Sequence, residues 1–152
     1  MKFYKLKEPG GYMSNYYRAR FFIYGRWWDT VEHAYQAQKC ALATEYDAIH
    51  QTKKANDARL LGQKVQMREH WDDFHKDVVM EECVRAKFLQ HKDLRDQLMA
   101  TGEEELIEDT TISNDMYWGC GADGTGKNRL GWILMKIRRE LKGEGRPLTP
   151  NL

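Results

Sequence analysis

The sequence has few cysteines and prolines, and it lacks both long apolar runs and an excess of charge of one sign. Cys40, Cys83 and Cys120 are widely spaced and form no CxxC pair, which favours reduced thiols over a disulfide framework or a structural zinc site. His70 and His75 are five residues apart, so they would lie on different faces of a helix, and no HExxH motif occurs. We therefore expect neither a metal nor a cofactor.

The short apolar runs and the balanced charge exclude two further classes of protein. No run is long enough for a signal peptide or a membrane span, so we expect a cytoplasmic protein with no membrane partner. The 24 Lys and Arg nearly balance the 23 Asp and Glu, which gives no broad electrostatic footprint for a nucleic-acid backbone. A small basic pocket that receives one phosphate is compatible with this balance.

Aromatic side chains, in contrast, are abundant: the chain has five Trp, eight Tyr and five Phe. Many of them stand beside glycines or charges rather than within apolar runs. We expect most to pack in the core or at its rim, although flat heterocycles are commonly held by such side chains.

The hydrophobic pattern predicts one α+β domain over residues 1–142, dominated by helices, with a small, mostly antiparallel N-terminal sheet. Residues 20–24 favour a strand, followed by a hairpin turn at 25–26. Thr30 is expected to cap a helix over about 31–43. Further helices are expected from 44 onward, from a cap at Asn56 to 62, over 73–91, from a cap at Asp93 to Gly102, and over 128–141, with a short strand at 106–108. The tail at 143–152 carries two prolines and is expected to be loose.

Two of these helices carry an apolar stripe at helical spacing. In the 73–91 helix the stripe consists of Phe74, Val78, Val79, Cys83, Ala86 and Leu89. In the last helix it consists of Leu130, Ile133, Leu134 and Ile137.

The first stretch that could carry chemistry is Trp28 to Lys39. At about 100° per residue, its polar side chains project within roughly 60° of one another; they are Glu32, Tyr35, Gln36 and Lys39. A carboxylate, an amide and an amine that face one way could surround a polar ligand. The alternative is a solvated face with ordinary salt bridges.

The second stretch is the glycine-rich segment 114–128. Its glycines lead into a helix that begins near Asn128, and backbone amides at such a junction, with Lys127 and Arg129 beside them, suit a phosphate. The segment is neither a P-loop nor a Rossmann fingerprint, and a flexible connection is the alternative. A third stretch is the turn at 13–16, where Ser14 and Asn15 could bind a ligand hydroxyl or simply shape the turn.

Together these stretches resemble the NADAR family, also known as YbiA-like proteins. The resemblance covers nearly the whole chain, and it rests on segments that occur in the family's order: SNY at 14–16, WDTVEHAYQAQK at 28–39, AxxxG at 58–62, VQMREHWD at 65–72, VMEECVRAKF at 79–88, LMATG at 98–102, DMYWGCG at 115–121 and GKNRLGWILMKIR at 126–138. It implies an α+β fold with N-glycosidase activity.

The resemblance also implies a small-molecule phosphoribosyl or ADP-ribosyl substrate. The substrate is either a phosphoribosylaminopyrimidine of riboflavin synthesis or ADP-ribosylated guanine, the latter in nucleic acid. In both, C1 of a ribose with a 5-phosphate is bonded to an amine outside the heterocycle ring. A rival interpretation is a non-catalytic module that binds ADP-ribose or another NAD derivative.

The catalytic residues implied by the resemblance are Glu32, Lys39 and Asp115. A glycosylamine can open to an imine, which a neutral lysine attacks; Lys39 is the candidate, with Glu32 as proton shuttle. The alternative is direct hydrolysis, with Glu32 or Asp115 stabilising an oxocarbenium-like state. The expected substrate-binding residues are Ser14, Asn15, Tyr16, Trp28, Tyr35, Gln36, Trp118, Gly119, Gly126, Lys127 and Asn128.

Overall fold

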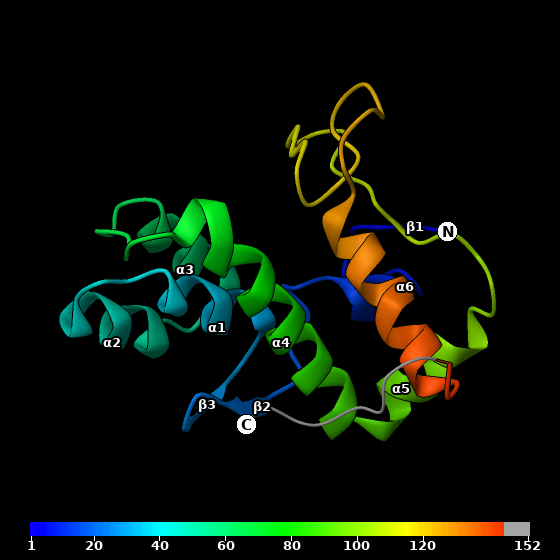
Figure 1. The fold of residues 1–152 in the computed structure, drawn as a ribbon, viewed down its shortest axis with the longest axis horizontal. Helices are drawn as coiled ribbons and strands as arrows, with labels where there is room; N and C mark the ends of the chain where they lie inside the picture. The colour runs from blue at the N-terminus through cyan, green and yellow to red at the C-terminus, as the bar shows by residue number, and fades with distance from the viewer. Residues whose placement is uncertain (145–152) are drawn as a thin grey trace. The chain divides into compact units, whose positions relative to one another are not determined.

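The structure, a computed structural model, describes residues 1–144 (Figure 1). The predicted loose tail therefore lies outside the described residues, apart from Gly143 and Glu144. The described chain is a helix-dominated α+β protein, as predicted. It divides into two compact units, residues 18–90 and residues 1–17 together with 91–144.

The 18–90 unit begins with a β-hairpin, which confirms the predicted one. Strand β2 (Phe21–Ile23) pairs antiparallel with β3 (Arg26–Trp28). The turn lies at Tyr24 and Gly25, one residue earlier than expected, and both residues have positive φ, 56° and 75°. Two-residue turns of this kind match the right-handed twist of the flanking strands.

Helix α1 (Val31–Gln38) begins where the sequence predicts and ends five residues early. The Thr30 side chain accepts a hydrogen bond from the His33 amide at 3.2 Å, the expected N-cap. The chain leaves the helix after Gln38 because it pairs with residues 66–68: the Arg68 amide donates to the Lys39 carbonyl at 2.9 Å, and an antiparallel bridge joins Cys40 to Met67.

The other helices of this unit are α2 (Ala43–Gln51), α3 (Ala55–Gly62), the π-helical turn η2 (Trp71–His75) and α4 (Lys76–Gln90). Helix α1 contacts α2, α3 and α4, which gather around it (Figure 1). Asn56 lies inside α3, whose N-cap is Lys54. The cap expected at Asn56 is therefore wrong by two residues.

The buried face of α4 differs from the predicted stripe. Phe74 and Val78 are 60% and 43% exposed. The π-helical turn inserts extra chain before α4 and so shifts Phe74 out of the helical phase. Because α4 packs against both α1 and β2, burial extends around the helix, over Val79, Met80, Cys83, Val84, Ala86, Lys87 and Phe88.

The second unit contains β1 (Lys2–Phe3), the 3₁₀ turn η1 (Gly11–Met13), α5 (Lys92–Ala100), β4 (Ile107–Glu108) and α6 (Arg129–Leu141). The predicted apolar stripe of α6 is buried as expected. His91, not Asp93, precedes α5 as its N-cap, and Gly102 follows the helix with a φ of 63°.

The strands correct the expectation of one N-terminal sheet. β1 pairs parallel with β4, with Lys2 beside Ile107 and Phe3 beside Glu108. The described strands therefore form two separate pairs, one parallel and one antiparallel. In residues 1–144 we find no helix with both the length and the apolar character needed to cross a membrane.

Candidate functional site

A buried carboxylate and amide lie one turn apart on α1. Glu32 and Gln36 are each only 7% exposed, and Gln36 Nε2 donates to Glu32 Oε1 at 2.9 Å. A buried carboxylate needs hydrogen bonds to offset its lost hydration. The amide therefore holds Glu32 in a defined orientation, and this polar face of α1 is not the solvated surface that was the alternative.

Lys39, the C-cap of α1, is half-buried and lies close to these side chains. Its Nζ donates to the Gly62 carbonyl at the end of α3, at 3.2 Å. Burial lowers the pKa of Lys39 below its ordinary value, while the negative charges of Glu32 and Asp72 act in the opposite direction. A lowered pKa increases the fraction of neutral amine near neutral pH, which a nucleophile needs.

Gly62 leaves room for the Gln36 amide. A Cβ on Gly62 would lie 2.0 Å from Gln36 Oε1, so any side chain here would displace the amide. Gln36 Oε1 is itself buried and has no hydrogen-bond partner among the described residues. A buried acceptor without a partner is costly to a protein alone, and it suits a ligand that brings a hydroxyl or an amine.

The turn η2 places the Trp71 ring beside α1. The Tyr35 and Trp71 ring centroids are 5.2 Å apart, and the Arg68 guanidinium lies 5.5 Å from the Trp71 centroid. Single π-helical turns frequently occur at functional sites. No role was predicted from the sequence for Gly62, Arg68, Trp71 or Asp72, although all but Gly62 lie in the polar run VQMREHWD that carries part of the family resemblance.

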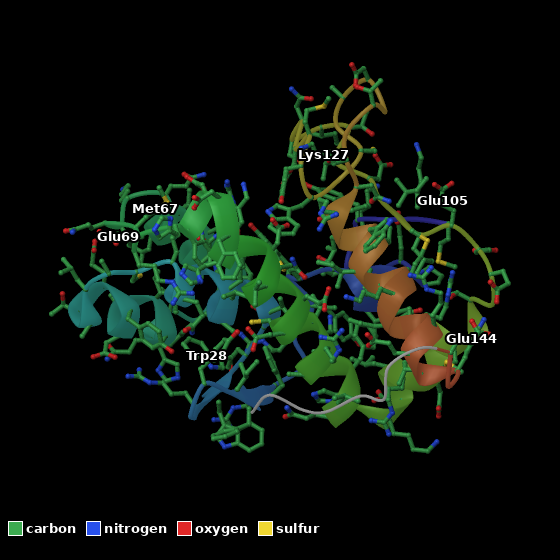
Figure 2. The ribbon with its side chains drawn as sticks, viewed as in Figure 1. Trp28, Met67, Glu69, Glu105, Lys127 and Glu144 are labelled. Atoms are coloured by element: carbon green, nitrogen blue, oxygen red, sulfur yellow. The ribbon has the colours of Figure 1, made fainter. Side chains whose placement is uncertain are left out.

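Trp28, a predicted substrate contact that Figure 2 labels, is buried in the 18–90 unit. It is 1% exposed, its Nε1 donates to the Ile23 carbonyl at 2.9 Å, and its ring meets Tyr46 and His50 edge to face. Packing alone accounts for this residue, so we leave it out of the proposed site.

In the other unit, the Asp115 carboxylate shapes a turn. Its Oδ1 accepts hydrogen bonds from the Tyr117 and Trp118 amides, both at 2.9 Å. The Thr110 hydroxyl donates to the Asp115 carbonyl at 2.8 Å. Trp118 is half-buried, with its ring edge to face with Tyr117. One carboxylate oxygen of Asp115 is thus already engaged by the backbone.

The glycine-rich loop uses its backbone amides within the chain. The Gly126 amide donates to the Cys120 carbonyl at 2.7 Å, the Lys127 amide to Met116 at 2.8 Å and the Asn128 amide to Gly119 at 3.0 Å. A Cβ on Gly119 would lie 2.3 Å from Thr110, and one on Gly126 would lie 2.4 Å from the Gly119 carbonyl. Gly119 and Gly126 therefore allow two chain segments to approach closely. The amides of Gly126, Lys127 and Asn128 are already hydrogen-bonded within the chain, so they do not form the open phosphate site that the sequence suggested.

The polar residues around this loop have identified neighbours. Asn128 Oδ1 accepts from the Glu108 amide at 3.0 Å and its Nδ2 donates to the Leu106 carbonyl at 2.8 Å, so its side chain fastens β4. Lys127 is exposed, with its Nζ 5.4 Å from the Tyr117 ring centroid (Figure 2). Arg129 lies 5.5 Å from the Trp132 centroid.

The turn at 13–16 belongs to the same unit. Ser14 Oγ accepts a hydrogen bond from the Tyr16 amide at 3.1 Å. Ser14 and Asn15 are buried and Tyr16 is half-buried. The Ser14 hydroxyl therefore shapes the turn, which is one of the two roles predicted for it from the sequence.

The predicted residues thus fall into two groups. Glu32, Tyr35, Gln36 and Lys39 lie together on α1 in the 18–90 unit, and the turn and loop residues belong to the other unit. In the described part of the chain, no group of three or more His, Cys, Asp or Glu side chains is arranged to hold a metal ion.

Comparison with known proteins identifies close relatives. The NADAR domain family matches residues 2–142. An N-glycosidase of Nostoc punctiforme is 39% identical over 145 residues, which cover 92% of this chain and 91% of that protein. The N-glycosidase YbiA of Escherichia coli K12 is 37% identical over 143 residues, 93% of this chain and 88% of that protein. The NMR structure of E. coli YbiA matches with a TM-score of 0.85 at 36% identity, over 96% of this chain and 88% of that one.

Both the family match and the full-length relatives therefore agree with the resemblance drawn from the sequence. The relatives carry the same enzymatic designation, which identifies this chain as a hydrolase that acts on N-glycosyl compounds. The chain belongs to the NADAR family.

Proposed function

We propose that the substrate is a phosphoribosylaminopyrimidine, an intermediate of riboflavin synthesis, and that the bond hydrolysed joins ribose C1 to the exocyclic amine. A riboflavin biosynthesis protein of Vibrio vulnificus is 39% identical over 142 residues, 92% of this chain and 38% of that longer protein. A chloroplastic riboflavin biosynthesis protein of maize is 32% identical over 128 residues, 76% of this chain and 20% of that protein. These relatives favour the riboflavin intermediate over ADP-ribosylated guanine.

The observation that carries the proposal is the arrangement on α1. A lysine whose pKa is lowered by burial lies near a buried glutamate that is oriented by a glutamine. The lysine supplies a nucleophile and the glutamate a group that can exchange protons. Both are required to cleave a glycosylamine through a covalent intermediate.

The proposed reaction begins when the ribose ring opens, so that C1 forms an imine with the exocyclic nitrogen. The neutral Nζ of Lys39 adds to C1, and Glu32 delivers a proton to the exocyclic nitrogen. Glu32 accepts the protons that the Lys39 nitrogen loses and returns them to the exocyclic nitrogen, so the aminopyrimidine leaves as a neutral amine with the electrons of its bond to C1, and C1 remains joined to Lys39 as an imine. Water, activated by Glu32, adds to C1 and releases ribose 5-phosphate and the free lysine.

Direct hydrolysis is the alternative route, in which Lys39 contributes only charge. Water would then attack an oxocarbenium-like C1 with Glu32 as the base. Asp115 and the other predicted contacts of the second unit stay proposals; they are Ser14, Asn15, Tyr16, Trp118, Gly119, Gly126, Lys127 and Asn128.

Incubation with the candidate substrates tests this function. The purified protein should release ribose 5-phosphate and the aminopyrimidine from the riboflavin intermediate, separated by chromatography, and Lys39→Ala should abolish the release. Faster release of ADP-ribose from ADP-ribosylated guanine would assign the other substrate. Tight binding of ADP-ribose without turnover of either compound would contradict the enzyme and favour the binding module.

A further inference from the structure

We propose that Arg68 is the residue that binds the 5-phosphate of the substrate's ribose, a phosphate subsite beside Lys39. This inference rests on the proposed function, since it concerns recognition of the same sugar phosphate. The sequence had pointed to the glycine-rich loop instead, but the amides of Gly126, Lys127 and Asn128 there donate to carbonyls of the chain.

Arg68 is fastened directly to the residue that would carry the sugar. Its amide donates to the Lys39 carbonyl at 2.9 Å. The adjacent residues of the two segments, Cys40 and Met67, form an antiparallel bridge. Figure 2 labels its two sequence neighbours, Met67 and Glu69, in the segment between α3 and α4. This pairing places the backbone of Arg68 at the end of α1, next to Lys39.

Within residues 1–144, the Arg68 guanidinium packs on an aromatic ring and forms no ion pair that would neutralise it. It lies 5.5 Å from the Trp71 ring centroid, and Trp71 is buried against Tyr35. Arg68 Nε is buried and has no hydrogen-bond partner among the described residues. A buried guanidinium N–H without an acceptor costs stability, and a phosphate oxygen is the acceptor that an arginine fork best fits.

An arginine is also the cation that the proposed chemistry needs at this place. A phosphate carries negative charge, and near Lys39 that charge would favour protonated lysine and so weaken the nucleophile. Arginine stays protonated at all relevant pH values, so it offsets the phosphate charge without competing for a proton. A lysine here would form weaker, less directed contacts with the phosphate.

Steady-state kinetics with a matched substrate pair tests the subsite. The two substrates are the phosphoribosylaminopyrimidine and its dephosphorylated ribosyl form. The test variants are Arg68→Gln and Arg68→Lys, and Arg59→Gln on α3 is the control. Arg68→Gln should raise KM for the phosphorylated substrate by about 10- to 100-fold, as expected for the loss of a charged hydrogen bond, and leave KM for the ribosyl form unchanged. Arg68→Lys should have a KM for the phosphorylated substrate between those of the wild type and Arg68→Gln. Arg59→Gln should have the KM of the wild type for both substrates.

Equal KM changes for both substrates, or no change for either, would overturn the inference. Loss of phosphate discrimination in Lys127→Gln but not in Arg68→Gln would return the subsite to the loop. Calorimetric titration with ribose 5-phosphate and with ribose supplies a readout that does not need turnover. If the wild type turns over neither substrate, the proposed function fails; if ribose 5-phosphate binds Arg68→Gln as well as the wild type, the subsite fails.

Discussion

At the scale of single residues, the protonation of Lys39 is set by a balance of burial and charge. Burial favours the neutral amine, and the negative charges of Glu32 and Asp72 favour the ammonium. Glu32 is needed for proton transfer in the proposed reaction. Asp72 is exposed, so its charge can be removed with little structural change.

Asp72→Asn should lower the pKa of Lys39 further, because it removes a negative charge that stabilises the ammonium. Activity that needs neutral lysine rises with pH through that pKa, so the acid limb of the kcat/KM profile should move to lower pH, by a few tenths of a unit for an exposed carboxylate. Asp73→Asn is the matched control, since this neighbouring exposed carboxylate pairs with His70 instead. A shift of the same size in both variants, or an opposite shift in Asp72→Asn, would refute this account of Lys39.

At the scale of elements, the end of α3 and the polar face of α1 fit together through Gly62. Gly62→Ala should displace the Gln36 amide, because the new methyl would meet Gln36 Oε1 at 2.0 Å. Overpacking of this kind typically costs about 1–3 kcal/mol, and Glu32 would lose its orienting partner. We expect a lower midpoint of urea unfolding and a reduced kcat.

The double variant Gly62→Ala with Gln36→Ala separates these two effects. Removing the amide makes room for the methyl, so stability should recover relative to Gly62→Ala. Activity should stay low because Glu32 is still unsupported. A loss of stability in the double variant equal to the sum of the losses in the two single variants would show that the two residues do not interfere.

Asn128 joins two elements of the other unit, since it precedes α6 and its side chain bonds to both sides of β4. Asn128→Gly keeps access to its left-handed backbone, φ 49°, but loses both bonds, so it should destabilise the protein by about 1–3 kcal/mol. Asn128→Ala should cost about 1 kcal/mol more, because alanine resists this conformation. Urea unfolding of the two variants measures the difference; identical stability of Asn128→Gly and the wild type would contradict the role of the side chain.

At the scale of the whole molecule, the sequence predicted the elements whose signals are local. The Thr30 cap and the stripe of α6 depend on neighbouring residues only, and both are observed. The early end of α1 depends on pairing with residues 66–68, more than 25 positions away, and no local pattern encodes it. The π-helical turn before α4 likewise changed which side chains of that region are buried.

The candidate site shows the same division. Glu32, Gln36 and Lys39 share a face because helical geometry places them there, so their spacing was informative. Gly62, Arg68 and Trp71 reach that face only through tertiary packing. A glycine-rich segment before a helix has the same sequence pattern whether its amides bind a ligand or donate to carbonyls of the chain. The hydrogen-bond partners of the loop amides could therefore not be predicted from the sequence.

Trapping with borohydride tests the central claim, that Lys39 bonds covalently to ribose C1, most directly. Reduction during turnover should add the mass of a reduced ribose 5-phosphate to the peptide that contains Lys39, and no adduct should form in Lys39→Arg. Lys39→Arg should also be nearly as inactive as Lys39→Ala, because arginine keeps the charge but is not a nucleophile. Absence of any adduct, together with an active Lys39→Arg, would contradict the imine route and leave Lys39 as an electrostatic contact.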